Sequence, residues 1–271
     1  MDWKKLETAF LHAWGGAFSK GKWFICFCTL SLCGVLAVFC RALSVESSPW
    51  VYLSLLFLPG FISSSFLLIF GVFCVRTYEQ EKRGTVVGMA RMARGCVGTA
   101  VGTSYFAFPP ILIYLLLWVM LGFFFLLKEI PLLGPFFNVV FAFGPFLLIF
   151  CSLILCLFNV VVLFFIVPAA THQSVKTMDF VYRTGHSIRA QPFLAGLLLF
   201  IACLPALLIG GILTLAAVIA NTSFSLGAPT PLLALEWFFV MLPFCGALAP
   251  AVLFFFHFAA ESYQILKDLH V

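Results

Sequence analysis

The polar stretch at residues 167–193 reads VPAATHQSVKTMDFVYRTGHSIRAQPF and is one of only two sizeable polar segments in an otherwise apolar chain. Apolar runs long enough to cross a membrane flank it on both sides. On a helix, five of its side chains would form one polar stripe: His172, Lys176, Asp179, Arg183 and His186. One metal ion cannot bridge the two histidines, because the helix between them would be about 20 Å long. The stretch therefore predicts a polar connection between two spans, with ion pairs or lipid contacts along the stripe.

The bulk composition indicates that lipid is the solvent for most of the chain. Of its 271 residues, 63% are hydrophobic and only 9% are charged, whereas soluble proteins carry about 25% charged residues. No basic run is interleaved with aromatic residues, so we expect no nucleic-acid partner. Nine of the ten cysteines lie in apolar runs, where they act as small apolar residues. The expected fold class is an all-α, polytopic integral membrane protein.

Apolar runs of about 20 residues predict six transmembrane helices, in a single membrane domain that covers residues 1–271. The spans are expected at about residues 23–40, 49–75, 103–127, 145–167, 193–220 and 232–259. In the long fourth run, Gly144 and Pro145 predict a division into a short outer segment and a span. Residues 1–22 carry aromatic side chains at helical spacing opposite lysines, which predicts an amphipathic helix in the headgroup layer.

The placement of lysine and arginine predicts how the chain is oriented. Of the 15 basic residues, all but Arg41 and Lys128 fall on one side of the predicted spans. The positive-inside rule then places both termini in the cytoplasm, in a multi-pass protein of the cytoplasmic (inner) membrane. Membrane lipids are the expected partners, and contacts with other membrane proteins or a homo-oligomer stay open. Five basic residues are candidate contacts for lipid headgroups or other anions: Arg91, Arg94, Lys176, Arg183 and Arg189.

A basic, glycine-containing segment precedes each pair of predicted spans. Residues 10–24 (FLHAWGGAFSKGKWF) and 180–193 (FVYRTGHSIRAQPF) align so that Gly15 matches Gly185. The middle segment, residues 89–98 (MARMARGCVG), shares mainly the basic amphipathic character. The pattern predicts three helical-hairpin repeats, each with a cytoplasmic interfacial amphipathic helix that leads into two spans. The alternative is that basic loops with glycine are common on the cytoplasmic side of membrane proteins.

Two segments resemble the membrane domain of bacterial glycerophosphoryl diester phosphodiesterases and related uncharacterised six-span membrane protein families. Pro168 and Ala169 follow a span and precede an amphipathic helix at residues 175–189, as in those families, and residues 9–24 are similar to their opening helix. The resemblance covers these segments and the hydropathy profile, and it implies a fold. It implies no activity, since nothing in these residues corresponds to the soluble phosphodiesterase domain.

Two acid–base side chains and one amide fall within predicted spans: Glu236, His257 and Asn159. Polar groups at such positions are costly in lipid and often mark functional sites. Glu236 and His257 cannot form one dyad, because about 30 Å of helix separates them. Alternatively, Glu236 and His257 extend to the headgroups, and Asn159 bonds another helix.

The sequence contains no nucleophile with a base within reach and no phosphate-binding loop, so we expect no catalytic residue, cofactor or metal site. The favoured hypothesis is a non-enzymatic protein that organises or regulates components of the membrane. The alternatives are a small-molecule transporter or permease subunit and a lipid-modifying membrane enzyme. A transporter should bring Asn159 and the polar groups of the fifth and sixth spans to one wet cavity. An enzyme should gather four residues in one cytoplasmic pocket: Arg91, Arg94, His172 and His186.

Overall fold

The computed structural model of the chain describes residues 3–44, 49–84, 99, 103, 105–128, 134–172, 191–219 and 231–268. This part is built from helices and contains no strand, which confirms the all-α prediction. Seven helices follow one another along it: α1 (Trp3–Ala17), α2 (Lys20–Ser44), α3 (Pro49–Lys82), α5 (Phe108–Lys128), α6 (Gly134–His172), α8 (Pro192–Ile219) and α9 (Pro231–Asp268).

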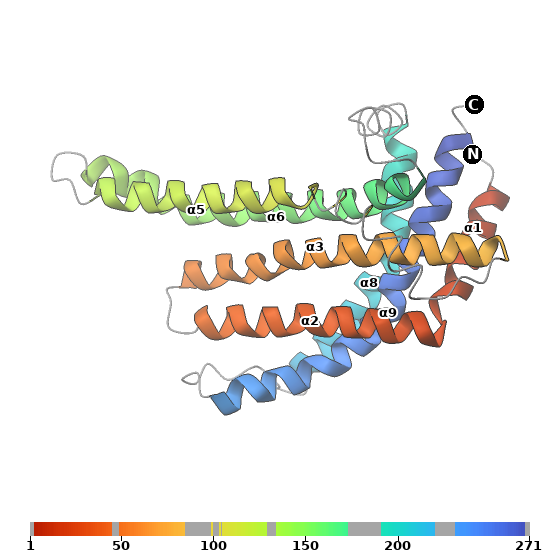
Figure 1. The fold of residues 1–271 in the computed structure, drawn as a ribbon. Coiled ribbons are helices and arrows are strands. Elements are labelled where there is room, and N and C mark those ends of the chain that lie inside the picture. The colour runs from red at the N-terminus through yellow and green to blue at the C-terminus, as the bar shows by residue number, and fades with distance from the viewer. Residues whose placement is uncertain are drawn as a thin grey trace.

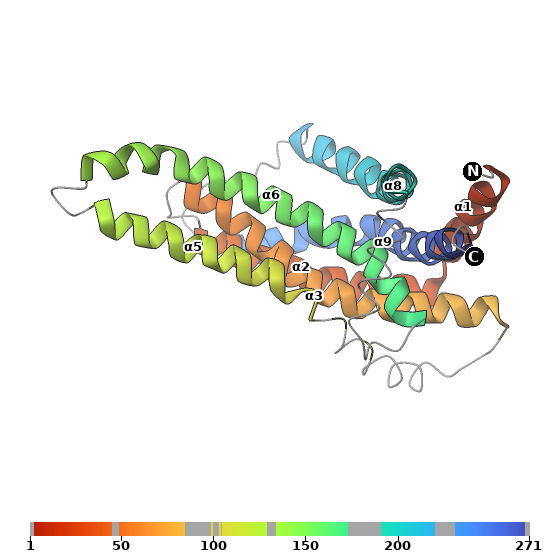
Figure 2. The same cartoon turned by 90° about the horizontal axis from the view of Figure 1, so that it is seen from above.

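Most of the helices form an elongated bundle, and its two ends differ. In Figures 1 and 2, α2, α3, α5 and α6 lie side by side along the long axis. α1 and the C-terminal part of α9 lie together at one end of this bundle. The last turns of α3 reach the same end, while the connection between α2 and α3 is at the opposite end. We call the end with α1 the basal end.

Five helices in the described part are long and apolar enough to cross a membrane. Their apolar stretches are Lys20–Ser44, Leu55–Lys82, Phe146–Thr171, Pro192–Ile219 and Leu235–Lys267. α5 contributes a shorter apolar stretch, Phe108–Phe123. The expectation of a multi-pass membrane protein is therefore supported by five helices, and the sixth crossing stays a prediction.

α6 continues through Gly144 and Pro145, where the sequence predicted a division. Proline removes one backbone hydrogen bond from a helix. In an apolar environment, however, a helix is the arrangement that satisfies the remaining backbone groups, so an unbroken α6 is favoured over a loop at this position.

α1 is a helix, as the sequence predicted, but the face that packs against the protein is made of small residues. Ala9, Ala13 and Ala17 recur every fourth residue and are buried. Phe10 and Trp14 flank this row and pack against Phe254 of α9, with ring centroids 5.2 and 5.6 Å apart. Small residues bring two helix backbones close together, so α1 lies directly on α9.

The core lies where α3, α6 and α9 meet, and aromatic side chains of α9 fill it. Phe254, Phe256 and Phe258 are all buried, and Phe255 packs on Phe164 of α6 at 5.6 Å. Gly71 of α3 lies against the ring of Phe256. A Cβ at Gly71 would stand 2.8 Å from Cζ and 2.9 Å from Cδ1 of that ring, and nearer still to Cε1.

The close contact of α3 with α9 is testable with a matched pair of glycines in one helix. We expect Gly71→Ala to destabilise the protein by about 1–3 kcal/mol, because the new methyl group overlaps the Phe256 ring. Gly60→Ala is the control, since a Cβ there meets nothing within 4 Å. This control should be neutral or stabilising by up to about 1 kcal/mol. Thermal unfolding of the purified full chain in detergent measures both changes.

A Phe256→Leu substitution in the Gly71→Ala background should recover part of the lost stability, since it removes the ring that the methyl group meets. Equal melting temperatures for Gly71→Ala and Gly60→Ala would contradict this packing.

Candidate functional site: a buried polar cluster and a pocket at the basal end

Polar residues from α2, α3 and α9 meet at the basal end in what we call the polar cluster. It consists of Lys22, Tyr78, Glu81, Lys82, His257 and Glu261. Tyr78, Glu81 and Lys82 are three and four residues apart and so lie on one face of α3. His257 and Glu261 are four apart and share a face of α9. The cluster therefore forms where these two faces meet.

Glu261 is the anionic centre of the polar cluster. Its side chain is buried, and its Oε1 accepts hydrogen bonds from the hydroxyl of Tyr78 at 2.7 Å and from Nζ of Lys82 at 2.8 Å. Lys82 also reaches Oε2 at 3.1 Å. A buried carboxylate is tolerated only with a counter-charge and hydrogen bonds, and here α3 supplies both to α9.

Lys22 connects α2 to the polar cluster. Its Nζ donates to Oε2 of Glu81 at 2.6 Å and stands 5.8 Å from the ring centroid of Tyr78. The Lys22 side chain is only 5% exposed, whereas that of Glu81 is 59% exposed. The ammonium group is thus the desolvated partner of this pair, and Glu81 is the carboxylate that makes its burial tolerable.

His257 lies between α9, α3 and α1. It is 0% exposed, and its ring stacks on that of Tyr78 with centroids 4.5 Å apart and planes 20° apart. Gly16 of α1 lies against the same ring, where a Cβ would come within 3.0 Å of Nδ1. Neither ring nitrogen has a hydrogen-bond partner in the described part of the chain, and the backbone of Ala13 is close without meeting hydrogen-bond geometry.

The interpretation of His257 as a side chain that extends to the headgroups is therefore wrong. α1 lies across this part of α9 and covers the ring, because the glycine at position 16 permits the close approach. A side chain at position 16 would press against the imidazole, and glycine leaves the ring its room.

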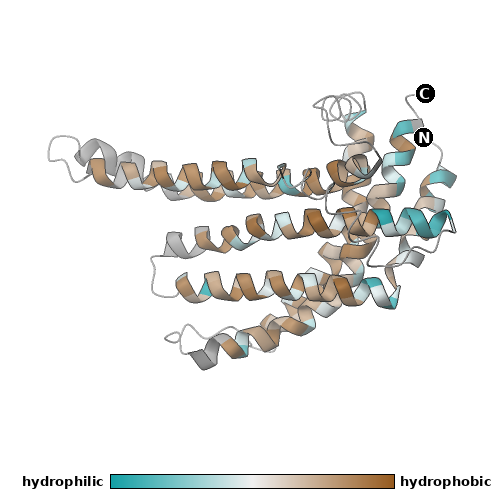
Figure 3. Ribbon diagram, in the orientation of Figure 1, coloured by the Kyte–Doolittle hydropathy of each residue, from teal (hydrophilic) through white to brown (hydrophobic). Residues whose placement is uncertain are grey.

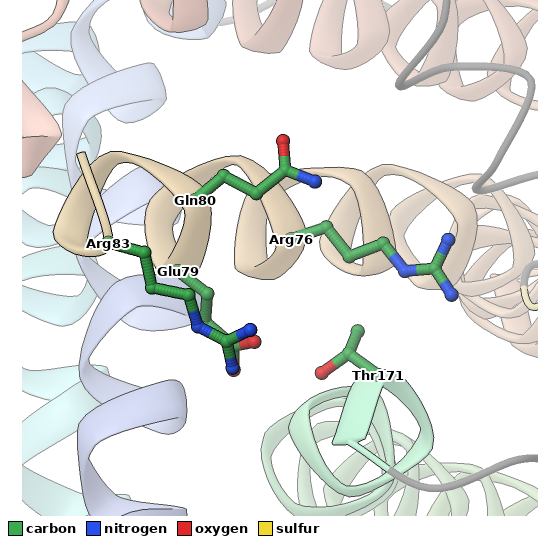
Figure 4. A pocket seen from close by; sticks show the side chains of 5 residues that line it. All are labelled: Arg76, Glu79, Gln80, Arg83 and Thr171. Atoms are coloured by element: carbon green, nitrogen blue, oxygen red, sulfur yellow. The ribbon is translucent and has the colours of Figure 1, made fainter. Parts of the chain in front are cut away.

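A pocket opens on the other side of α3. It has a volume of about 310 Å³ and is lined by five residues: Arg76, Glu79, Gln80, Arg83 and Thr171 (Figure 4). Thr171 is near the end of α6, Arg76, Glu79 and Gln80 come from the last turns of α3, and Arg83 directly follows α3. Nη2 of Arg76 donates to the hydroxyl of Thr99 at 2.6 Å. We call this site the α3–α6 pocket.

The polar cluster and the α3–α6 pocket use opposite faces of one helix. At about 100° per residue, Arg76, Gln80 and Arg83 fall on one stripe of α3, while Tyr78 and Lys82 are turned away from its members by about 100–160°. The first stripe faces α6 and the second faces α9. The last turns of α3 therefore connect two polar sites that the rest of the bundle keeps apart.

The structure places some of the sequence-predicted polar residues and leaves others untested. The candidate anion contacts Arg91, Arg94, Lys176, Arg183 and Arg189 all lie outside the described residues, as does His186, and they stay predictions. The same holds for most of the second and third proposed repeat segments. Nothing is described of the His172 side chain.

Asn159 and Glu236 differ in their surroundings. Asn159 is buried in α6 and forms no side-chain hydrogen bond with any residue that the structure describes, so the predicted bond to another helix is not found there. Glu236 is exposed near the start of α9. Its neighbour Trp237 is buried, and the guanidinium of Arg41 lies 4.9 Å from the Trp237 ring centroid.

The pattern of the sequence does not single out Tyr78, Glu261 or the residues of the α3–α6 pocket. A weak signal was present, since Arg76, Gln80 and Arg83 recur at helical spacing directly after an apolar run. In the described part of the chain, no group of three or more His, Cys, Asp or Glu residues is arranged to hold a metal ion.

No protein-family model matches this chain, and no curated protein or solved structure is significantly similar to it. Its function is therefore argued from the two sites at the basal end.

Proposed function

We propose that this protein crosses the cytoplasmic (inner) membrane six times and organises or regulates components of that membrane without catalysis. α2, α3, α5, α6, α8 and α9 would provide the crossings, with both termini in the cytoplasm. α1 would lie in the headgroup layer at the cytoplasmic face. A shared architecture with the membrane domain of glycerophosphoryl diester phosphodiesterases is part of this proposal, and no activity is carried over with it.

The observation that carries the proposal is that the charged groups of the polar cluster are paired with one another between helices. Glu261 is bound by Tyr78 and Lys82, and Lys22 is bound by Glu81. Each bond joins two different helices, so these groups act as ties between α2, α3 and α9. Covalent catalysis needs a nucleophile next to a base that is itself held in place, and these pairings provide no such arrangement.

The distribution of charge supports a cytoplasmic basal end. Figure 3 shows the hydrophilic residues gathered on α1 and at the ends of α3 and α9. Eight basic residues belong to these segments and to the start of α2: Lys4, Lys5, Lys20, Lys22, Arg76, Lys82, Arg83 and Lys267. Arg41 is at the opposite end of α2. An excess of lysine and arginine is the usual mark of the cytoplasmic side.

Membrane lipids are the partners that the outer surface supports best. α8 packs mainly on α9 and leaves one long apolar face exposed. Six large side chains form that face: Phe200, Leu204, Leu207, Leu208, Ile212 and Leu215. Exposed apolar area of this extent is unusual in soluble proteins and is expected in lipid. Another membrane protein or a second copy of the chain would fit the same surface.

Transport is the second candidate, and the burial of two polar side chains, Asn159 and His257, favours it. The ring nitrogens of His257 have no hydrogen-bond partner in the described residues. Polar groups held in a span often line a substrate path. Against transport, several hydroxyls in the spans bond the backbone of their own helix instead of a shared site. Ser64 donates to Phe61, Ser152 to Leu148, and Thr214 to Gly210.

The number of crossings can be tested by reporter fusions to the full chain in a bacterial host. Six crossings place the two termini on the same side, whereas five would place them on opposite sides. We expect green fluorescent protein to fluoresce at either terminus. Alkaline phosphatase should be active when inserted within residues 129–133 and inactive when inserted within residues 85–98. Activity of the phosphatase at one terminus would contradict the proposed topology.

The absence of catalysis makes a separate prediction. Purified full-length protein incubated with total bacterial membrane phospholipids should leave their composition unchanged by mass spectrometry. A heat-denatured sample is the control for spontaneous breakdown. A new phosphorus-containing product that forms only with the folded protein would contradict a non-enzymatic role and support the lipid-modifying alternative.

A further inference from the structure

We infer that the α3–α6 pocket binds a phosphate group, carried by a phospholipid headgroup or present as a free anion. The inference deepens the proposed function and rests on it, since it requires the basal end to lie at the headgroup level. It concerns residues that are distinct from the polar cluster and from the predicted contacts in residues 85–98 and 173–190.

The side chains that line the pocket have the chemistry of a phosphate site. Arg76 and Arg83 each present a planar guanidinium, which matches the oxygens of phosphate better than a lysine ammonium does. Figure 4 shows their two guanidinium groups on either side of Thr171. Glu79 reduces the formal charge of the pocket to +1, from two arginines and one carboxylate. This charge balances a phosphodiester monoanion.

Arg83 is the residue most available to such a ligand. Its side chain is exposed and forms no hydrogen bond or ion pair with the residues that the structure describes. Arg76 is held at the pocket by its bond to Thr99. One guanidinium is thus positioned by the protein, and the other lines the pocket without a described partner.

The acceptors in the pocket suit a headgroup that carries hydrogen-bond donors beside its phosphate. Thr171 donates its hydroxyl hydrogen to the carbonyl of Pro168 at 2.6 Å, so toward a ligand its hydroxyl can act only as an acceptor. The Glu79 carboxylate, an acceptor-only group, lines the same pocket. A headgroup whose far end carries a hydroxyl or ammonium would supply donors to them. The volume of about 310 Å³ is also at the lower end of the range for small-molecule sites and exceeds the needs of one phosphate.

The position of the pocket along the helices agrees with the headgroup layer. Arg76 directly follows the buried apolar residues Val72 and Val75. Thr171 ends the apolar stretch Phe146–Thr171 of α6. Both helices therefore change from apolar to polar at the pocket, which is where lipid phosphates lie relative to the hydrocarbon core.

Lipid binding to the full chain tests the inference. Native mass spectrometry of the detergent-solubilised protein would be titrated with phosphatidylglycerol and with a diglucosyl diacylglycerol of the same acyl chains, which carries no phosphate. We expect the phospholipid to bind more tightly than the glycolipid. Arg83→Gln and Arg76→Gln should each weaken phosphatidylglycerol binding roughly tenfold, the effect of losing one charge-assisted contact. Arg76→Lys should rescue only part of the loss, because the planar fork is missing.

Lys20→Gln is the matched control, since Lys20 is an exposed cation of the basal end that does not line the pocket. It removes the same charge and should change affinity less than twofold. Equal losses for Lys20→Gln and Arg83→Gln would show a diffuse surface attraction and overturn the inference, as would equal binding of the two lipids by the wild type.

A second titration with inorganic phosphate, followed by calorimetry, distinguishes the two sources. If phosphate binding releases heat in the wild type but not in Arg83→Gln, and if phosphate displaces the bound phospholipid, the pocket is assigned to a free anion. Phospholipid binding that phosphate does not displace assigns it to the headgroup. No binding of either probe overturns the inference. The reporter fusions measure the topology of the chain separately. A pocket that binds no phosphate would therefore overturn this inference without contradicting the six proposed crossings.

Discussion

The close approach of α3 to α9 is the constraint on which the basal end depends. Gly71 lets the Phe256 ring lie against the α3 backbone, and two helical turns later on the same face, Tyr78 bonds Glu261. With the two helices this close, the His257 ring stacks on Tyr78 and is buried. Gly16 then allows α1 to close over both rings. The packing of Phe256 on Gly71 sets the distance between α3 and α9, and the bond from Tyr78 to the buried Glu261 carboxylate fixes how the two helices align along their axes.

This arrangement gives the last turns of α3 two roles. One face holds the helices together through Tyr78 and Lys82, and the opposite face presents Arg76 and Arg83 to the α3–α6 pocket. A site lined by long, flexible arginines benefits from a helix that does not move, because less side-chain and backbone freedom is lost on binding. We therefore regard the polar cluster as the support that positions the proposed phosphate site.

The sequence predicted the helical fold class, but it missed the continuity of α6 through Gly144 and Pro145 and most residues of the site. Apolar runs of about 20 residues satisfy their backbone groups in lipid as helices, and residues 3–17 have helical spacing, so the all-α prediction and α1 were correct. The sites depend on contacts between residues far apart in the chain, such as Tyr78 with Glu261 and Lys22 with Glu81. Periodicity does not report which helix faces which. For the same reason, the sequence left open whether His257 lies inside the protein or extends to the headgroups, because periodicity does not show that α1 covers it.

The most direct test of this account is a double-mutant cycle between Tyr78 and Glu261, measured as the free energy of unfolding in mixed micelles. Tyr78→Phe, Glu261→Met and the double variant would be compared with the wild type. Because a hydrogen bond to a charged group contributes about 1.5–3 kcal/mol, we predict a coupling energy of at least about 1 kcal/mol. Effects that add to within about 0.5 kcal/mol would contradict the claim that this bond holds α3 against α9.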